Sequence, residues 1–453
     1  MKIAIVQEHV DIRRGGAETS TLEMAGQLAA LGLDVTVVCV GSDEATERRS
    51  DEELDSQGTP GGWPIASAVG DANATSSNAT GREQTPRLKF HRIPITTGSR
   101  VARAVRFVAE ADRYCREERF DIVHAVTPCF SCNVYQPRGG TYVEAVRRST
   151  GRARTWLGRF LKRFGRRFNR RQRFLLLVER AMLSDPNPPF VAAVSDYVAD
   201  QVRQAFPAHP AERLRVVFNG VEIDPLHDEE SRTRRLAVRR ELGIDHATPL
   251  VLFVAHNFKL KGLGELLHAT AIRSQSESEP EAQARAHFQS EPEAQAWAHH
   301  SRDGTPHAAW TLAVVGRGNP APFRRLARKL GILDPVRFLG PRGDLAALYA
   351  AADVLAHPTW YDPCSRVVLE ALCCGLPVVT TRFNGAAEVM EAGRHGVVLD
   401  SPRDVEALAA AIDECLKPSV RAACTADAPR MRERLSMARH ARELADVYKQ
   451  ILR

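Results

Sequence analysis

The amino-acid sequence predicts an α/β fold with two doubly wound, Rossmann-like domains, each a parallel sheet covered by helices. The chain has 453 residues, which exceeds the size at which one hydrophobic core keeps growing. Short apolar runs alternate with helix-forming segments, as strands and helices do around a parallel sheet. This series occurs twice, with a polar linker at 224–241 between the copies. The expected domains span 1–218 and 219–432, followed by a helix over 433–453 that is able to return to the first domain.

The first domain is expected to open as a strand, a glycine loop, a helix and a second strand. The loop carries Gly15 and Gly16, and the helix spans Thr21–Leu31. Another helix begins after Ser195, a good N-cap residue, and runs to about Ala205. The expected strands are Lys2–Val6, Asp34–Val40, Leu88–Ile93, Ile122–Ala125, Phe190–Val194 and Leu214–Ile223. Residues 41–87 lack periodicity and apolar content, so a mobile insertion is expected there.

The second domain repeats the alternation of strands and helices. Its expected strands are Pro249–Val254, Trp310–Val315, Val336–Leu339, Val354–His357 and Pro377–Thr380. Its expected helices include Gly264–Ile272, Pro322–Leu330 and Leu345–Ala351. Residues 274–307 interrupt the series with a duplication, SEPEAQARAH and SEPEAQAWAH. Two copies are too few for a solenoid, so a surface insertion is expected.

One further helix is expected between two carboxylates, Asp362 and Glu370. Asp362 is a good N-cap residue, Pro363 suits the first helical position, and Gly375 suits the position after the helix. Eight helical positions would separate the two carboxylates by roughly 12 Å, about the length of an extended nucleotide-sugar. The free N–H groups of the first turn would provide an anion site, and they belong to Cys364, Ser365 and Arg366.

Composition indicates a soluble globular protein in the cytosol. Hydrophobic residues make up 44% and charged residues 26% of the chain. No apolar run approaches the ~18 residues of a membrane span, and the start MKIAIVQEH turns polar too early for a signal peptide. The nine cysteines are expected to be reduced thiols, because the lone pair at zinc-site spacing, Cys129 and Cys132, has no second pair.

Several motifs together resemble those of retaining glycosyltransferases of the GT-B fold, in the group that includes bacterial lipopolysaccharide and polysaccharide glycosyltransferases. These motifs are the start MKIAIVQEH with its glycine loop, AVSDYVADQ, VVFNGVEI, KLKGLGELLHA, VRFLGPRGDLAALYAAADVLAHPTWYDP and VLEALCCGLPVVTTRFNGAAEV. The resemblance implies two Rossmann-like domains that face a central cleft. It also implies transfer of a hexose from a nucleotide-diphospho-sugar, UDP-glucose or a relative, to a lipopolysaccharide-core, lipid-linked or polysaccharide acceptor.

Donor-binding residues follow from the resemblance. The family's pair of acids eight positions apart corresponds to Asp362, for the donor sugar hydroxyls, and Glu370, for the ribose hydroxyls. Lys261, helped by Lys259, is the expected cation for the diphosphate. The chain departs from the family at two of these positions. Asp362 replaces the usual glutamate and is one methylene shorter, and His256 replaces the usual arginine, so Lys261 is expected to carry more of the diphosphate charge.

The resemblance implies three further contacts with substrate. Gly15 and Gly16 would let the backbone approach the diphosphate and the acceptor, although a simple turn would look the same. His124 stands at the first position of a frequent H-x-H motif, as a contact to acceptor or donor sugar or as a structural histidine. Arg342 and the turn Phe338–Gly340 correspond to the base-binding loop.

No cofactor and no metal are expected. The sequence has no D-x-D pair in a strand-to-loop position, so protein cations and helix dipoles would meet the charge of the diphosphate. Retention of anomeric configuration is implied by the family alone. Because no nucleophile stands out, front-face substitution is expected, in which the leaving phosphate accepts the proton of the acceptor.

A basic segment at 147–173 contains twelve Lys or Arg residues and no Asp or Glu. Its helical pattern sets an aromatic stripe against the cations Arg159, Lys162, Arg163, Arg166 and Arg167. Such a helix can lie on an anionic membrane, near which each basic residue gains about 1 kcal/mol, and can bind acceptor phosphates. The alternative is a helix packed on the first domain with its arginines in solvent. Nucleic acid ranks lowest as a partner, because no reader module accompanies the segment.

Other functions remain open at this point. A GT-B-like epimerase would interconvert nucleotide-sugars without an acceptor, and a membrane scaffold could retain a degenerate donor site. A dehydrogenase is disfavoured, because Gly316 and Gly318 lack the third glycine of a dinucleotide fingerprint. The favoured expectation is a peripheral enzyme on the cytoplasmic membrane face.

Overall fold

A computed structural model describes residues 1–10, 16–41, 88–151, 170–223, 228–245, 248–274 and 310–453. The chain divides into two compact units. Unit 1 contains Met1–Glu222 and Leu435–Arg453, and unit 2 contains Ile223–Arg434. The domain boundaries expected from the sequence were 218/219 and 432/433.

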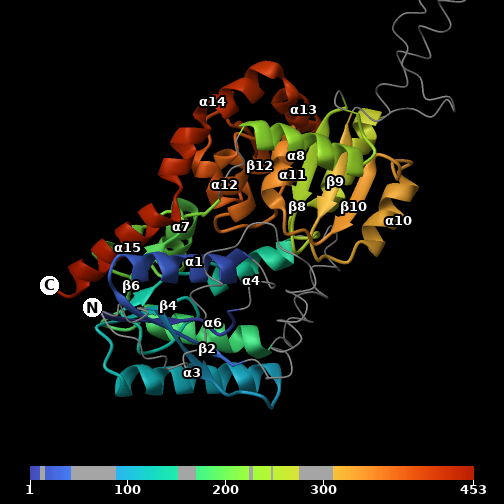
Figure 1. Ribbon diagram of the computed structural model, residues 1–453. Helices are drawn as coiled ribbons and strands as arrows, with labels where there is room; N and C mark the ends of the chain where they lie inside the picture. Colours follow the sequence, from blue (N-terminus) through green and yellow to red (C-terminus); the bar gives the residue numbers. More distant parts are fainter. Residues whose placement is uncertain (11–15, 42–87, 152–169, 224–227, 246–247, 275–309) are drawn as a thin grey trace, which may run out of the picture. The chain divides into compact units, whose positions relative to one another are not determined.

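Unit 1 is built on a seven-stranded parallel sheet with the order β3-β2-β1-β4-β5-β6-β7 (Figure 1). The order reverses between β1 and β4, which is the arrangement of a doubly wound sheet. The strands are β1 (Lys2–Val6), β2 (Asp34–Val40), β3 (Leu88–Ile93), β4 (Ile122–Ala125), β5 (Val134–Tyr135), β6 (Phe190–Ala193) and β7 (Leu214–Val216). The central strands β1 and β4 are mostly apolar and, apart from Lys2, buried, as expected for a sheet with helices on its two faces.

Helices of unit 1 begin where the sequence supplies caps. Ser195 Oγ accepts the N–H of Val198 at 3.2 Å, which confirms the predicted N-cap. Ser99 does the same for a helix that the sequence analysis did not identify. The helices are α1 (Gly16–Ala30), α3 (Arg100–Glu117), α4 (Tyr142–Gly151), α6 (Arg170–Leu183), α7 (Asp196–Ala205), the 3-10 turn η2 (Ala211–Arg213) and α15 (Met437–Ile451).

The C-terminal helix α15 is part of the core of unit 1. Its apolar face, including Leu444 and Tyr448, packs with Ile3 and Ile5 of β1 and with Met24 of α1. All five side chains are fully buried. Burial of a Leu or Ile side chain contributes about 1.5–3 kcal/mol, so these contacts stabilise the return of the chain to unit 1.

Unit 2 is built on a six-stranded parallel sheet with the order β10-β9-β8-β11-β12-β13 (Figure 1). The order reverses between β8 and β11. The strands are β8 (Leu250–Val254), β9 (Thr311–Val315), β10 (Val336–Gly340), β11 (Val354–Ala356), β12 (Val378–Thr381) and β13 (Gly396–Leu399). The helices are α8 (Asp228–Glu241), residues 263–274, α10 (Ala321–Lys329), α11 (Leu345–Ala351), α12 (Arg366–Cys373), the 3-10 turn η3 (Gly385–Val389), α13 (Val405–Leu416) and α14 (Pro418–Arg434).

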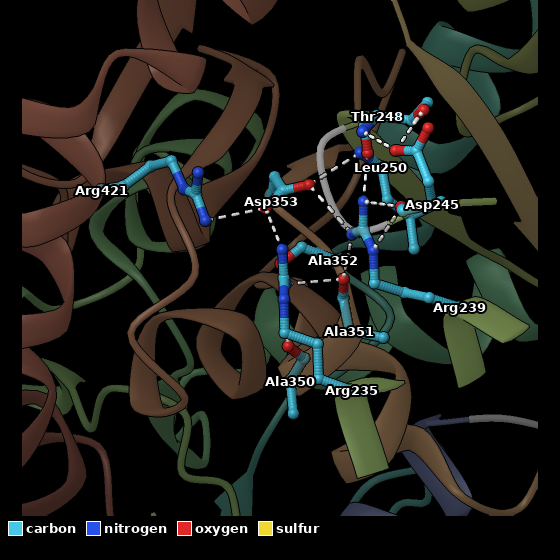
Figure 2. Close-up of polar contacts among 10 residues, drawn as sticks. All are labelled: Arg235, Arg239, Asp245, Thr248, Leu250, Ala350, Ala351, Ala352, Asp353 and Arg421. Atoms are coloured by element: carbon cyan, nitrogen blue, oxygen red, sulfur yellow. Dashed lines mark hydrogen bonds and ion pairs between the residues drawn. The ribbon is translucent and has the colours of Figure 1, made fainter. Parts of the chain in front are cut away.

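A buried carboxylate holds the amino end of this second sheet together. Asp353, which precedes β11, accepts the N–H of Leu250 at 2.8 Å, and three arginines converge on it (Figure 2). Its oxygens lie 2.7 Å from Arg235, 2.8 Å from Arg421 and 3.3 Å from Arg239. Burial favours a higher pKa for Asp353, but the N–H of Leu250 and the arginines outweigh it and lower that pKa. The cluster therefore joins α8 and α14 to the edge opposite the carboxyl ends of the strands.

The two parallel sheets confirm the predicted α/β fold class. The sequence did not identify α3, α4, α6, β5, β13, α13 or α14. Strand β7 ends at Val216 and is shorter than expected. The predicted insertions at 41–87 and 274–307, Gly15, and the aromatic and basic residues from Trp156 to Phe168 fall almost entirely outside the described residues.

Candidate active site

Polar side chains gather in unit 2 at the carboxyl ends of β8 and β11, the two strands between which the sheet order reverses. His256 and Lys261 follow β8, and His357 and Asp362 follow β11. Ligands of open parallel sheets bind outside the carboxyl ends of the strands at this reversal. The sequence therefore places Lys261 and Asp362 where a doubly wound domain binds its ligand.

Lys261 and Asp362 form an ion pair. The Lys261 Nζ atom lies 2.5 Å from Asp362 Oδ2 and donates a second hydrogen bond to the carbonyl of Tyr361 at 3.2 Å. Their side chains are 18% and 12% exposed, so the pair is shielded from bulk solvent without being sealed from it. Lys261 and Asp362, which were each expected to contact the donor, thus contact one another, although 101 positions separate them in the sequence.

A fully buried histidine supports the same carboxylate. His357 Nε2 lies 3.4 Å from Asp362 Oδ2 and 3.3 Å from Ser365 Oγ. An ionised carboxylate only accepts hydrogen bonds, so Nε2 carries the proton. The other nitrogen, Nδ1, is buried and makes no hydrogen bond to any described residue. His357 was predicted only as the end of a strand, although its place five residues before Asp362 was visible in the sequence.

The pair of charges fixes the protonation of this cluster. Burial favours a higher pKa for Asp362, but the Lys261 ammonium and the His357 N–H outweigh it and hold that pKa well below the usual range. Burial lowers the pKa of His357, against the smaller opposite effect of its hydrogen bond to Asp362. At neutral pH the cluster therefore contains an ammonium, a carboxylate and a neutral imidazole.

The prediction that Asp362 is the N-cap of the following helix is wrong. Helix α12 begins at Arg366, and its N-cap is Ser365. The backbone of Asp362 is extended, because its N–H donates to Phe383 and its carbonyl accepts from Gly385. Only the part from Arg366 to Glu370 is helical and rises about 6 Å, so the 12 Å separation computed for a continuous helix does not apply. The predicted helix end is confirmed, since Gly375 has a φ of 73° after the cap Cys374.

The first turn of α12 is also less open than expected. The Ser365 N–H donates to Asn384 Oδ1 at 3.1 Å, so it is not free for an anion in this structure. Asn384 is 2% exposed and also accepts the N–H of Ala386, while its amide nitrogen donates to Thr380. Asn384 therefore fastens the start of α12 to the end of β12.

Glu370 is buried on α12 and held on both of its oxygens. Tyr349 donates its hydroxyl to Oε2 at 2.9 Å, and Arg366 donates to Oε1 at 3.1 Å. Each carboxylate oxygen can accept more than one hydrogen bond, so both retain capacity for a vicinal diol. The two hydrogen bonds thus fix the orientation of the side chain.

His256 and Arg342 lie at the same edge in different states. His256 is exposed, and partial burial of its ring followed by repulsion from Arg317 lowers its pKa, so it is neutral at pH 7. The Arg342 guanidinium binds Glu241 and Asp344, and these hydrogen bonds raise its pKa. Its side chain is therefore paired with two protein carboxylates.

The remaining predicted residues belong to unit 1 or fall outside the description. His124 is fully buried, and its Nδ1 lies 2.6 Å from the hydroxyl of Tyr448 on α15. Burial, with repulsion from Arg138, lowers the pKa of His124 to about 3. Its other ring nitrogen, Nε2, is buried and has no hydrogen-bond partner among the described residues. Gly16 is the exposed first residue of α1. The predicted membrane or acceptor residues Arg159, Lys162, Arg163, Arg166 and Arg167 lie outside the described residues.

The described residues contain neither a metal-binding cluster nor a membrane-spanning helix. No group of three or more His, Cys, Asp or Glu side chains is placed there to hold a metal ion. None of the helices in the described ranges is long and apolar enough to cross a membrane.

Two family models match most of the chain between them. Residues 14–225 match Glycosyltransferase Family 4, and residues 293–418 match Glycosyl transferases group 1. The lipopolysaccharide glucosyltransferase WaaG of Escherichia coli is 26% identical over 327 residues, which cover 72% of this chain and 76% of WaaG. The D-inositol 3-phosphate glycosyltransferase of Corynebacterium kroppenstedtii is 30% identical over 244 residues, and the chain spans about half of its length, 49%.

Solved structures match over nearly the whole chain. The crystal structure of WaaG has a TM-score of 0.69 at 21% identity and covers 98% of this chain and 99% of WaaG. The structure of Anabaena Alr3699/HepE in complex with UDP-glucose has a TM-score of 0.64 at 18% identity, with coverage of 99% and 100%. At these identities the structural matches show the fold alone. With the two family matches and the two parallel-sheet units, they identify the chain as a glycosyltransferase of the GT-B fold, with a family 4 domain and a group 1 domain.

Proposed function

We propose that this glycosyltransferase moves a hexose from a nucleotide-diphospho-sugar, UDP-glucose or a close relative, to a lipopolysaccharide-core or lipid-linked acceptor, with retention of configuration and without a metal. In this proposal Lys261 binds the diphosphate, Asp362 accepts hydrogen bonds from the sugar hydroxyls, and Glu370 binds the ribose hydroxyls. The observation that carries the proposal is the Lys261–Asp362 pair at the reversal of the sheet of unit 2.

The arrangement of charges supports this assignment of roles. An ammonium that is 18% exposed can reach an incoming phosphate, and the carboxylate beside it is ionised and able to accept hydroxyl protons. In the bound state the diphosphate would share Lys261 with Asp362. The charge that develops on the leaving phosphate would then be met by a cation already fixed in place.

The proposed chemical step is a front-face substitution. The bond between the anomeric carbon and the leaving phosphate oxygen breaks, and the acceptor oxygen forms a bond to the same face of that carbon. The acceptor proton passes to the leaving phosphate, so no enzyme nucleophile is required. A covalent glycosyl-enzyme trapped on any carboxylate would contradict this step.

The relatives support the substrate classes. WaaG is named as a lipopolysaccharide glucosyltransferase, and the HepE structure contains UDP-glucose. These names suggest a UDP-sugar donor and a glycolipid acceptor here. The basic composition of residues 147–173 suggests binding to an anionic membrane or to acceptor phosphates. Reversal of the charges of Arg163, Arg166 and Arg167 should then abolish sedimentation with phosphatidylglycerol vesicles, and unchanged sedimentation would refute the membrane part.

The test is product formation from a panel of nucleotide-sugars with a deacylated lipopolysaccharide core as acceptor. We expect one donor to give nucleoside diphosphate together with a glycosylated product whose anomeric configuration, determined by NMR, matches that of the donor. Activity should persist in EDTA. Interconversion of the nucleotide-sugar without an acceptor would indicate an epimerase instead, and binding of a donor without turnover across a full acceptor set would support a non-catalytic protein.

A further inference from the structure

The carboxyl ends of β8 and β9 bring His256 and Arg317 together. The two strands are neighbours, and the Ala255 N–H donates to the carbonyl of Val315 at 3.0 Å. Neighbouring strands lie about 4.8 Å apart, so the residues that leave the two strands emerge side by side. The next residue after Ala255 is His256, and Arg317 follows the strand end by two positions.

Two glycines fix the backbone on each side of Arg317. Gly316 has a φ of 133°, and a Cβ atom there would lie 1.8 Å from the carbonyl oxygen of Ala255. At Gly318 a Cβ atom would lie 2.6 Å from the ring of Phe258, which is 4% exposed. The loop therefore presses on both the end of β8 and the turn that leads to Lys261. Only glycine permits this approach, so the position of Arg317 is built into the fold.

Three other cations of unit 2 are paired with carboxylates, whereas Arg317 is not. Lys261 pairs with Asp362, Arg366 with Glu370, and Arg342 with Glu241 and Asp344. Arg317 is exposed and forms no ion pair or hydrogen bond with any residue in the described part of the chain. An arginine held at the ligand-binding edge of a sheet without a carboxylate partner is suited to a planar oxyanion such as phosphate.

We propose that Arg317 binds the diphosphate of the donor and supplies the positive charge that His256 does not. This inference rests on the proposed function, because it assigns a further residue to the same donor site. Repulsion from Arg317 contributes to the lowered pKa of His256, so the two side chains interact electrostatically. Only the arginine is charged at neutral pH. The chain thus carries its second phosphate-binding cation on the loop after β9.

The test is calorimetric titration of UDP, with GDP and ADP in parallel, into wild-type protein and Arg317→Ala. Loss of a charge-assisted hydrogen bond should weaken binding of the preferred nucleoside diphosphate about 10- to 100-fold. Binding of the corresponding nucleoside, which lacks phosphates, should be unchanged. Thermal unfolding without nucleotide should also match the wild type, because Arg317 is exposed.

Arg328→Ala is the matched control. Arg328 is exposed on α10, the helix that follows the loop of Arg317, and its substitution removes the same charge. Because α10 runs back toward the amino edge of the sheet, nucleotide binding should stay at the wild-type level. In the Arg317→Ala background, His256→Arg should recover most of the lost affinity. Equal affinity of wild-type and Arg317→Ala for the nucleoside diphosphate would overturn the inference and leave the proposed function intact. Failure of the wild type to bind any nucleoside diphosphate would overturn both.

Discussion

The Lys261 ammonium lies 2.5 Å from the Asp362 carboxylate in unit 2, and neither side chain is more than 18% exposed. The cation assigned to phosphate and the anion assigned to sugar hydroxyls therefore neutralise one another. Lys261 contributes to the low pKa of Asp362 and so helps to keep this carboxylate ionised. Substitutions at the two positions should consequently have opposite effects on phosphate binding.

Asp362→Asn should separate donor binding from turnover. The amide does not compete for Lys261, so we expect UDP to bind several-fold more tightly. The rate of transfer should fall by about 100-fold or more, because a neutral amide stabilises the transition state less well than the carboxylate that accepts hydrogen bonds from the sugar hydroxyls. Calorimetry and initial rates would measure the two effects. Equal losses in both, or unchanged transfer, would argue against the assigned role.

His357→Leu should shift the acid limb of the rate profile. The His357 N–H stabilises the ionised form of Asp362, so its loss should raise the pKa of Asp362 and move the acid limb of kcat/KM to higher pH. His357→Gln, which keeps an N–H donor near the same place, should restore part of the profile. The measurement is kcat/KM over a pH range that extends below about 4, where aspartate carboxylates take up their proton.

His395 provides the control for this prediction. It is also fully buried in unit 2 and binds an aspartate through Nε2, with 2.9 Å to Asp427. His395→Leu should lower stability without moving the acid limb of the rate profile. A similar shift in both variants would mean that loss of a buried histidine, and not its contact with Asp362, is responsible.

Glu370→Gln should remove discrimination for the ribose hydroxyls. In wild-type protein, 2′-deoxy-UDP should bind about tenfold more weakly than UDP, which corresponds to loss of a hydrogen bond to a charged group. The glutamine variant should bind UDP more weakly and distinguish the two ligands little. The dissociation constants of UDP and 2′-deoxy-UDP for the wild type and for Glu370→Gln give the coupling free energy between Glu370 and the 2′-hydroxyl. If the effects of the two changes on the binding free energy are additive, the ribose binds elsewhere.

Glu179→Gln should change how stability depends on pH. Glu179 is fully buried in unit 1, where Tyr135 donates its hydroxyl and Tyr142 its N–H to the carboxyl group. Burial raises the pKa of Glu179 to about 7, so the folded state holds its proton where the unfolded state has lost it. The resulting stabilisation is present below the unfolded pKa, near 4.5, and is lost as the pH rises to about 7.

Urea unfolding at pH 5 and pH 8 measures this effect. The free energy of unfolding of the wild type, relative to Glu179→Gln, should fall by about 2–3 kcal/mol between the two values. The variant serves as its own baseline, because any packing change it introduces is the same at both pH values. A difference that does not vary with pH would mean that Glu179 titrates normally.

The strands were predictable because their signal is local. Val251 to Phe253 and Ile3 to Ile5 are apolar runs that are buried on both faces, and the burial itself explains the runs. Ser195 was predictable as an N-cap for the same reason, since its oxygen bonds three residues ahead. Lys261 and Asp362 could be paired only through the family resemblance, because their contact spans 101 positions.

The start of α12 was not predictable from local propensity. Asp362 is a favourable N-cap, but Lys261, His357 and the backbone of Phe383 compete for it through tertiary contacts. The helix then begins after Ser365, whose hydroxyl makes no capping hydrogen bond and lies instead 3.3 Å from His357 Nε2. Long-range contacts also account for the three arginines around Asp353, two of which come from α8 and one from α14, and which belong to no recognisable motif (Figure 2).

The most direct test of the donor-site assignment is calorimetric titration of UDP, GDP and ADP into wild-type protein and Lys261→Ala, with Lys329→Ala, at the exposed end of α10, as the charge-matched control. We expect the wild type and the control to bind one of these nucleotides with equal affinity. Lys261→Ala should bind it about 10- to 100-fold more weakly, the loss expected for a charge-assisted contact. Equal affinity of all three proteins for the nucleotide, or failure of the wild type to bind any of the three nucleotides, would contradict the assignment of Lys261 to the donor site.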